Sequence, residues 1–162
     1  MKSIAFAALT SVVLALSSAS LAQAETDIQE HDSDRPQSAY VPGLGDIMGA
    51  TQMRHAKLWF AGQNGNWQLA GYELGEIKEG FEVAVTLHPN FMGVPVSSLI
   101  TAFTAKPLDA LVSAIAARSK DDFTKAFDQL TSGCNGCHHA ANKPFIVINR
   151  PSVPPVSNQV FG

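Results

Sequence analysis

The sequence predicts an all-α protein, an antiparallel four-helix bundle followed by an irregular proline-rich tail. Apolar residues recur with a period near 3.6 residues in four segments between about residues 44 and 141. Glycine- and proline-containing stretches separate these segments, as expected for turns between helices. None of the segments requires the strict apolar–polar alternation of a β-strand.

The first two helices follow from regular apolar stripes. We expect the first from about Leu44 to Ala61, ending at a turn with Gly62 and Gly65. The second is expected to run from Asn66, whose side chain would cap it, to Leu87.

The third and fourth helices have clear starts but different regularity. Ser97 or Ser98 would cap the third helix, and Pro107 is expected either to kink it or to begin a new helix that continues to Ser119. The fourth is expected to start between Ser119 and Asp121, where acidic residues favour the positive end of the helix dipole. Its apolar stripe ends near residue 138.

That stripe ends in Cys134-Asn135-Gly136-Cys137-His138, the C-x-x-C-H signature of covalent c-type haem attachment. Two thiols three residues apart share one helical face, so each can add across a porphyrin vinyl group. The next residue, His138, is then an axial iron ligand. The sequence therefore predicts one haem c, held by Cys134 and Cys137 near the C-terminal end of the fourth helix.

Other uses of the two cysteines are less consistent with the sequence. They are the only cysteines in the chain. A redox dithiol of the thioredoxin type is expected beside a βαβ pattern, which is absent from the sequence. A zinc site would need His138 and His139 as well, and four ligands within six residues would strain tetrahedral geometry.

The N-terminus predicts export. Lys2 is followed by an apolar run from Ile4 to Leu16 and by Ala22-Gln23-Ala24, a small-x-small cleavage site. We therefore expect a signal peptide over 1–24, a flexible leader over 25–42, a cytochrome domain over 43–143 and a tail over 144–162. In a bacterium the destination is the periplasm.

Composition limits the partners. The chain has 14 Asp and Glu residues against 11 Lys and Arg residues, which argues against nucleic-acid binding. The apolar run at the N-terminus is too short to span a bilayer, and no later stretch is expected to do so. The predicted mature protein thus has no membrane anchor.

Four amphipathic helices with C-x-x-C-H near the end of the fourth resemble the cytochrome c′ family, the class II c-type cytochromes. The resemblance covers about Leu44 to Ala141, while the proline-rich tail and His139 indicate a branch apart from the well-studied members. It implies one haem in a four-helix bundle. Such proteins are often dimers, so a homodimer is one outcome, although the helix faces identify no interface.

The resemblance also indicates where a sixth iron ligand would lie. In this family a first-helix methionine makes the iron six-coordinate, whereas an apolar residue leaves it open. The matching position here is Ile47 or Met48, and Met48 is either that ligand or ordinary core packing. His55 is a weaker candidate, since a histidine on an inward stripe is more often a hydrogen-bonded core residue.

The remaining candidates are weaker still. Met53 is expected off the stripe, Met92 is expected in a loop, and His31 and His88 are expected to be exposed. Arg54, Lys57 or Lys143 could pair with a haem propionate.

These observations predict an electron carrier that exchanges electrons with redox partner proteins and has no catalytic residues. The alternative is capture of nitric oxide or carbon monoxide at five-coordinate haem, with a small gas as the ligand. A third interpretation, peroxide reduction with His55 as acid–base group, ranks last because spacing does not place that side chain.

Overall fold

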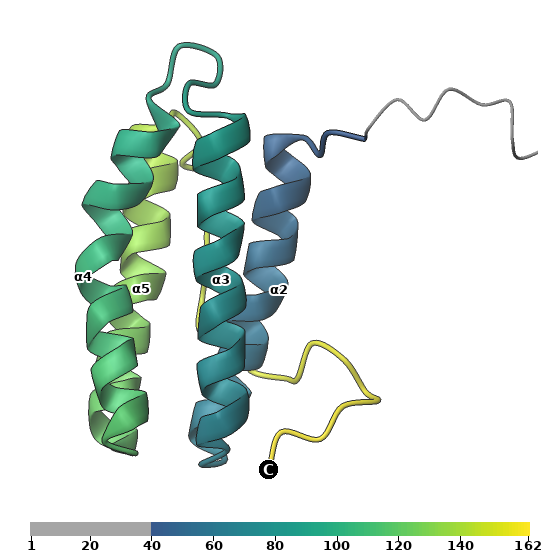
Figure 1. Ribbon diagram of the computed structural model, residues 1–162, viewed down its shortest axis with the longest axis vertical. Helices are drawn as coiled ribbons and strands as arrows, with labels where there is room; N and C mark the ends of the chain where they lie inside the picture. Colours follow the sequence, from purple (N-terminus) through teal and green to yellow (C-terminus); the bar gives the residue numbers. More distant parts are fainter. Residues whose placement is uncertain (1–39) are drawn as a thin grey trace, which may run out of the picture. The chain divides into compact units, whose positions relative to one another are not determined.

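A computed structural model describes residues 40–162, so the predicted signal peptide, most of the leader and His31 lie outside the described residues. Four α-helices follow one another: α2 (Leu44–Gln63), α3 (Trp67–Leu87), α4 (Val96–Ala116) and α5 (Lys120–Ala140) (Figure 1). Between residues 40 and 162 there is no β-strand beyond an isolated Phe91–Val94 bridge. The predicted all-α class with four packed helices is confirmed.

The helices pair unequally. α2 packs mainly against α3, and α4 packs mainly against α5, whereas the direct contact between α2 and α5 is much smaller. Short connections make successive helices antiparallel (Figure 1). The N-terminal half of α2 therefore lies at the same end of the bundle as the C-terminal end of α5.

Side chains at the helix starts explain why the predicted bounds were close. The Asn66 side chain accepts a hydrogen bond from the Leu69 amide at 3.1 Å and caps α3. Ser119 caps α5 by accepting from the Asp122 amide at 3.4 Å, while its hydroxyl donates to the Asp122 carboxylate at 2.7 Å. The predicted cap at Asn66 and the predicted start of the fourth helix between Ser119 and Asp121 are confirmed.

The helix α4 departs from the prediction at its start, because it begins at Val96, before either predicted serine cap. It then continues through Pro107 as one helix, so no new helix begins at that residue. Proline cannot donate to the carbonyl of Phe103, four residues earlier. That carbonyl lies against Gly133 of α5, where a Cβ atom would collide with it. The absence of a side chain at Gly133 thus lets α5 approach the interrupted turn closely.

The helix α4 is also long and apolar enough to cross a membrane by length and composition alone, so the expectation that no such stretch follows the N-terminus was wrong. Its buried stripe includes Ile100, Thr104 and Leu111. Lys106 and Asp109 lie on its exposed side.

An aromatic cluster fills the end of the bundle near the α2–α3 turn. Phe123 and Phe127 are fully buried, and Trp59 is 9% exposed. The rings of Trp59 and Phe127 lie 4.9 Å apart, and Trp67 packs edge-on to Phe123 at 6.0 Å. Trp59 and Phe127 therefore belong to the hydrophobic core, whereas Trp67 is half-buried at its edge.

The tail returns along the bundle instead of leaving it. It belongs to the same compact unit as the helices, Val41–Gly162. Arg150 forms a bidentate ion pair with Asp128 and lies over the Trp59 ring, 4.5 Å from its centroid. Near the C-terminus, the buried ring of Phe161 packs on the ring of Phe60 in the last turn of α2, with centroids 5.8 Å apart.

Candidate functional site

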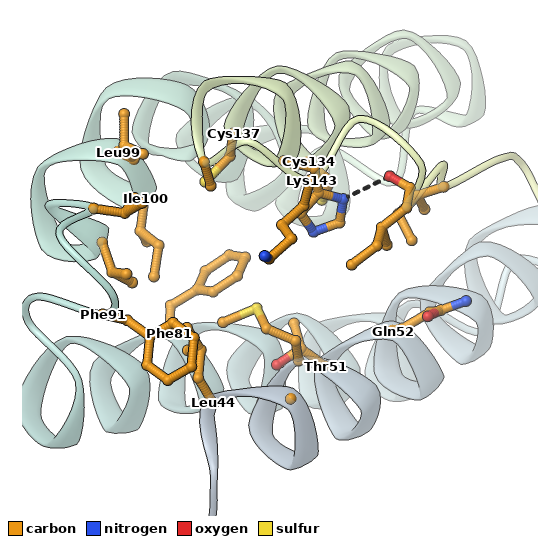
Figure 2. A pocket seen from close by; sticks show the side chains of 18 of the residues that line it. Leu44, Thr51, Gln52, Phe81, Phe91, Leu99, Ile100, Cys134, Cys137 and Lys143 are labelled. Atoms are coloured by element: carbon orange, nitrogen blue, oxygen red, sulfur yellow. Dashed lines mark hydrogen bonds between the residues drawn. The ribbon is translucent and has the colours of Figure 1, made fainter.

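A cavity of about 460 Å³ lies at the end of the bundle opposite the aromatic cluster. Cys134, Cys137 and His138 all line it, together with residues of α2, α3, α4 and the α3–α4 loop. Figure 2 shows Cys134, Cys137 and Lys143 on one side, with Leu44 and Thr51 on the other. The volume falls within the ~300–1,000 Å³ typical of cofactor and ligand sites.

Most of the cavity wall is apolar. Phe81 of α3 and Ile100 of α4 are largely buried side chains that face it, and Phe91 and Met92 contribute from the α3–α4 loop. Phe81 lies on the apolar stripe of α3. The periodicity of that stripe does not show whether a residue packs in the core or lines a cavity. It also does not show at which end of the bundle a cavity remains.

The two cysteine thiols are free and protonated. Burial, with a smaller contribution from the neighbouring Cys137 thiol, raises the pKa of Cys134 to about 11. Burial also raises the pKa of Cys137. A redox-active dithiol instead needs a lowered pKa, usually at a helix N-terminus, whereas these thiols lie near the C-terminal end of α5. The redox-dithiol interpretation is therefore disfavoured.

The geometry also disfavours the zinc alternative. Within residues 40–162, no three or more His, Cys, Asp or Glu side chains are grouped in a way that could hold a metal ion. His139 is exposed and does not line the cavity, although it is adjacent to His138 in the sequence.

The two residues between the cysteines have separate packing roles. Gly136 lies so close to the Phe103 ring that a Cβ at this position would come within 2.6 Å of a ring carbon. Asn135 binds the tail through both polar atoms of its side-chain amide: its Nδ2 donates to the Ile148 carbonyl at 2.8 Å, and its Oδ1 accepts from the Ile148 amide at 2.7 Å. Neither role could be inferred from the signature.

The His138 imidazole is held in one tautomer. Its Nδ1 lies 2.9 Å from the carbonyl oxygen of Ile146, drawn as a dashed line in Figure 2. A carbonyl can only accept, so Nδ1 carries the hydrogen, and in the neutral ring Nε2 keeps a free lone pair. This is the arrangement that a metal-binding histidine needs.

A turn at the end of α5 places the tail carbonyl near this ring. Asn142 has a positive φ of 58°. The amide of Lys143 donates to the His138 carbonyl at 2.8 Å, and the amide of Asn142 donates to His139 at 3.1 Å. This bonding pattern terminates helices and reverses the chain.

Both candidate sixth ligands lie on the α2 wall. Met48 is half-buried and lines the cavity between Gly45 and Gly49, two positions where a Cβ atom would meet nothing within 4 Å. Ile47, the other residue at this position, is 6% exposed and belongs to the hydrophobic core. Met53 is not among the lining residues.

His55 lines the same cavity but has a structural partner. The Thr131 hydroxyl donates to the Phe127 carbonyl, so it accepts from the His55 Nε2–H at 2.9 Å. The ring also stacks on Phe127 with centroids 4.3 Å apart. Burial lowers the pKa of His55 to about 4, which keeps the imidazole neutral near pH 7.

The three cations proposed for a propionate differ in position. Lys143 lines the cavity. Arg54 lies elsewhere and binds Glu73 and Glu76 at 3.3 and 2.8 Å. Lys57 is half-buried on α2 and is not part of the lining.

One further expectation was wrong. His88 is half-buried, not exposed, because its Nε2 donates to the Pro42 carbonyl at 2.9 Å and its ring packs edge-on to Phe91. In the apolar tail run from Phe145 to Ile148, Ile148 is 8% exposed, whereas Phe145 is 75% exposed.

No protein-family model, curated protein or solved structure matches this chain.

Proposed function

We propose that this protein is an exported monohaem c-type cytochrome, similar to cytochrome c′, that carries electrons between redox partner proteins. The observation that carries the proposal is the convergence of Cys134, Cys137 and His138 on one apolar cavity. Bound haem supplies the chemistry, a one-electron change between ferric and ferrous iron.

The residues present suit this group in three ways. The cavity has the volume and apolar walls that a porphyrin needs. The two thiols are free and adjacent on α5, as thioether links require. The His138 ring has its Nδ1 hydrogen-bonded and its Nε2 lone pair available for iron.

Met48 is the better candidate for a sixth ligand. It lines the cavity from α2, the helix that the resemblance assigns to this role, and its thioether has no competing hydrogen bond to satisfy. The Nε2 of His55 is already bonded to Thr131, so coordination through that nitrogen would cost a buried hydrogen bond. The same bond disfavours His55 as an acid–base group in peroxide reduction.

Lys143 is our candidate partner for a haem propionate. Its amine belongs to the cavity wall, and a charge-assisted bond to a carboxylate is about twice as strong as a neutral one. Arg54 is occupied by two glutamates, which makes it a weaker candidate.

Gas binding is the second candidate, and one observation favours it. The α2 wall has glycine at positions 45 and 49, so it offers open space on both sides of Met48. If Met48 only packs, that space would admit nitric oxide or carbon monoxide at an open iron position.

An absorption spectrum of the exported protein, recorded before and after adding carbon monoxide, tests the proposal. The protein should be produced with its own N-terminus in a bacterium that has the cytochrome maturation machinery. If the protein carries electrons and Met48 binds the iron, we expect a low-spin haem spectrum. Reversible reduction should change this spectrum, and carbon monoxide should leave it unchanged. A high-spin spectrum that shifts with the gas would favour the second candidate, and a colourless protein would refute both.

A further inference from the structure

The segment after α5 contacts the haem signature at two points. Ile146 contributes the carbonyl that accepts from His138 Nδ1, and Ile148 pairs with Asn135 through its amide and its carbonyl. The two contacts are two residues apart in the tail and three apart on α5. One short stretch of tail therefore lies along one face of the signature helix.

The Asn135 pair is stronger than an incidental surface contact. It uses the amide nitrogen and the amide oxygen of one side chain, at 2.8 and 2.7 Å, on the backbone of one residue. The Ile148 side chain is buried beside it. Both backbone groups of Ile148 are thereby satisfied in a segment that has no helix or strand.

The carbonyl of Ile146 is fixed from both ends of the segment. On the N-terminal side, the amide of Ile146 donates to the Lys143 carbonyl at 3.0 Å, just after the turn that ends α5. On the C-terminal side, Asn135 holds Ile148. An acceptor fixed in this way selects the ring orientation as well as the tautomer of His138.

We propose that Asn135 and residues 146–148 form a proximal clamp that holds the His138 imidazole ready to bind iron and raises its donor strength. Asn135 is a positioning residue. It bonds to Ile148 of the tail and takes no part in the hydrogen bond between His138 Nδ1 and the Ile146 carbonyl. This inference rests on the proposed haem function. It gives the proline-rich tail, which lies outside the cytochrome c′ resemblance, a direct role in setting the reduction potential.

The direction of the effect follows from electrostatics. A carbonyl that accepts from Nδ1–H makes the imidazole more electron-rich, which favours ferric over ferrous iron. Loosening the clamp should therefore raise the reduction potential. A merely structural tail contact would change stability and leave the potential where it was.

The test compares Asn135→Ala with two controls in the haem-loaded mature chain. Asn135→Ala keeps the C-x-x-C-H signature and places a better helix former in α5. Asn149→Ala changes the same residue type at an exposed tail position one residue beyond Ile148. Arg150→Ala loosens the tail further on, at its ion pair with Asp128. Two quantities are measured: hydrogen exchange of the Ile148 amide and the reduction potential.

We expect Asn135→Ala to lose protection of the Ile148 amide and to shift the potential upward, with both quantities unchanged in Asn149→Ala. Arg150→Ala should leave the potential unchanged. An unchanged potential in Asn135→Ala, a faster exchange of all α5 amides in that variant, or an equal upward shift in Arg150→Ala would overturn the clamp. Absence of haem from the unmutated chain would instead refute the proposed function, and the exchange measurement would still test the contact.

Discussion

The two ends of this bundle are built from the same four helices but are filled differently. Near the α2–α3 turn, the buried rings of Trp59, Phe123 and Phe127 pack against one another between α2 and α5. At the opposite end, the same two helices present glycines, Met48 and two thiols to a cavity of about 460 Å³. The closed end holds the helices together, and the open end is free to serve a bound group.

The difference shows why a small α2–α5 contact can still define a site. Ring stacking at the closed end fixes the distance between the two helices. The tail also connects α5 and α2, because Ile148 bonds to Asn135 of α5 and Phe161 packs on Phe60 of α2. The open end therefore keeps its walls in position with little direct packing across the cavity.

The largest effect is expected at the open end, from Cys134→Ser with Cys137→Ser. This change removes both proposed attachment thiols, so haem should be lost completely under denaturing extraction, which mass spectrometry measures. Either single variant should keep one link and remain coloured. Haem retained through denaturation by the double variant would mean that the attachment residues are misassigned.

A matched pair of leucines should then separate the two ends in stability. Leu130 is 1% exposed and belongs to the core cluster of α5, and its replacement by Ala should cost about 2–5 kcal/mol. Leu99 is half-buried at the cavity, so Leu99→Ala should cost about 1 kcal/mol or less in haem-free protein. Urea unfolding measures both, and equal costs would contradict the division into a closed and an open end.

His55, which lies between the two ends, should make stability fall in acid. Burial lowers its pKa from 6.5 to about 4, so the unfolded chain binds this proton more readily than the folded one. The stabilisation is present above pH 6.5 and is lost as the pH falls towards 4. The loss attributable to His55 should approach about 3 kcal/mol.

Denaturant unfolding at several pH values, in the parent chain and in His55→Gln, measures this contribution. The variant should lose most of the slope between pH 6.5 and 4. His139→Gln, at an exposed neighbour of the signature, should keep it. An unchanged slope in His55→Gln would show that His55 is not buried as a neutral ring.

The smallest change in stability is expected from Met48→Leu, because the two side chains have similar volumes and such exchanges usually cost less than about 1.5 kcal/mol. Its spectral effect should nevertheless be clear, since leucine cannot coordinate iron: the variant should become high-spin and bind carbon monoxide. Met53→Leu, outside the cavity, is the control. An unchanged low-spin spectrum in Met48→Leu would remove Met48 as the ligand.

Sequence reasoning was accurate where the determinants are local. Asn66 and Ser119 mark helix starts because their side chains bond amides within three residues. It failed where a distant residue decides the outcome. The Phe103 carbonyl, to which Pro107 cannot donate, lies against Gly133 of another helix, and the half-burial of His88 depends on a hydrogen bond to Pro42.

The candidate site divides in the same way. The spacing of Cys134, Cys137 and His138 predicts a shared face, and all three line one cavity. The bond between Asn135 and Ile148 joins the signature to a tail with no periodicity, so no pattern in the sequence could reveal it. The Thr131 partner of His55 lies 76 residues away and was equally inaccessible.

The mass of the peptide that contains Cys134 and Cys137 tests the central claim most directly. The protein should be exported from a host with cytochrome maturation machinery, denatured, extracted and digested. We expect this peptide to carry the mass of one haem with both thiols consumed. A peptide at its bare mass, with two thiols that still react with an alkylating agent, would contradict the account.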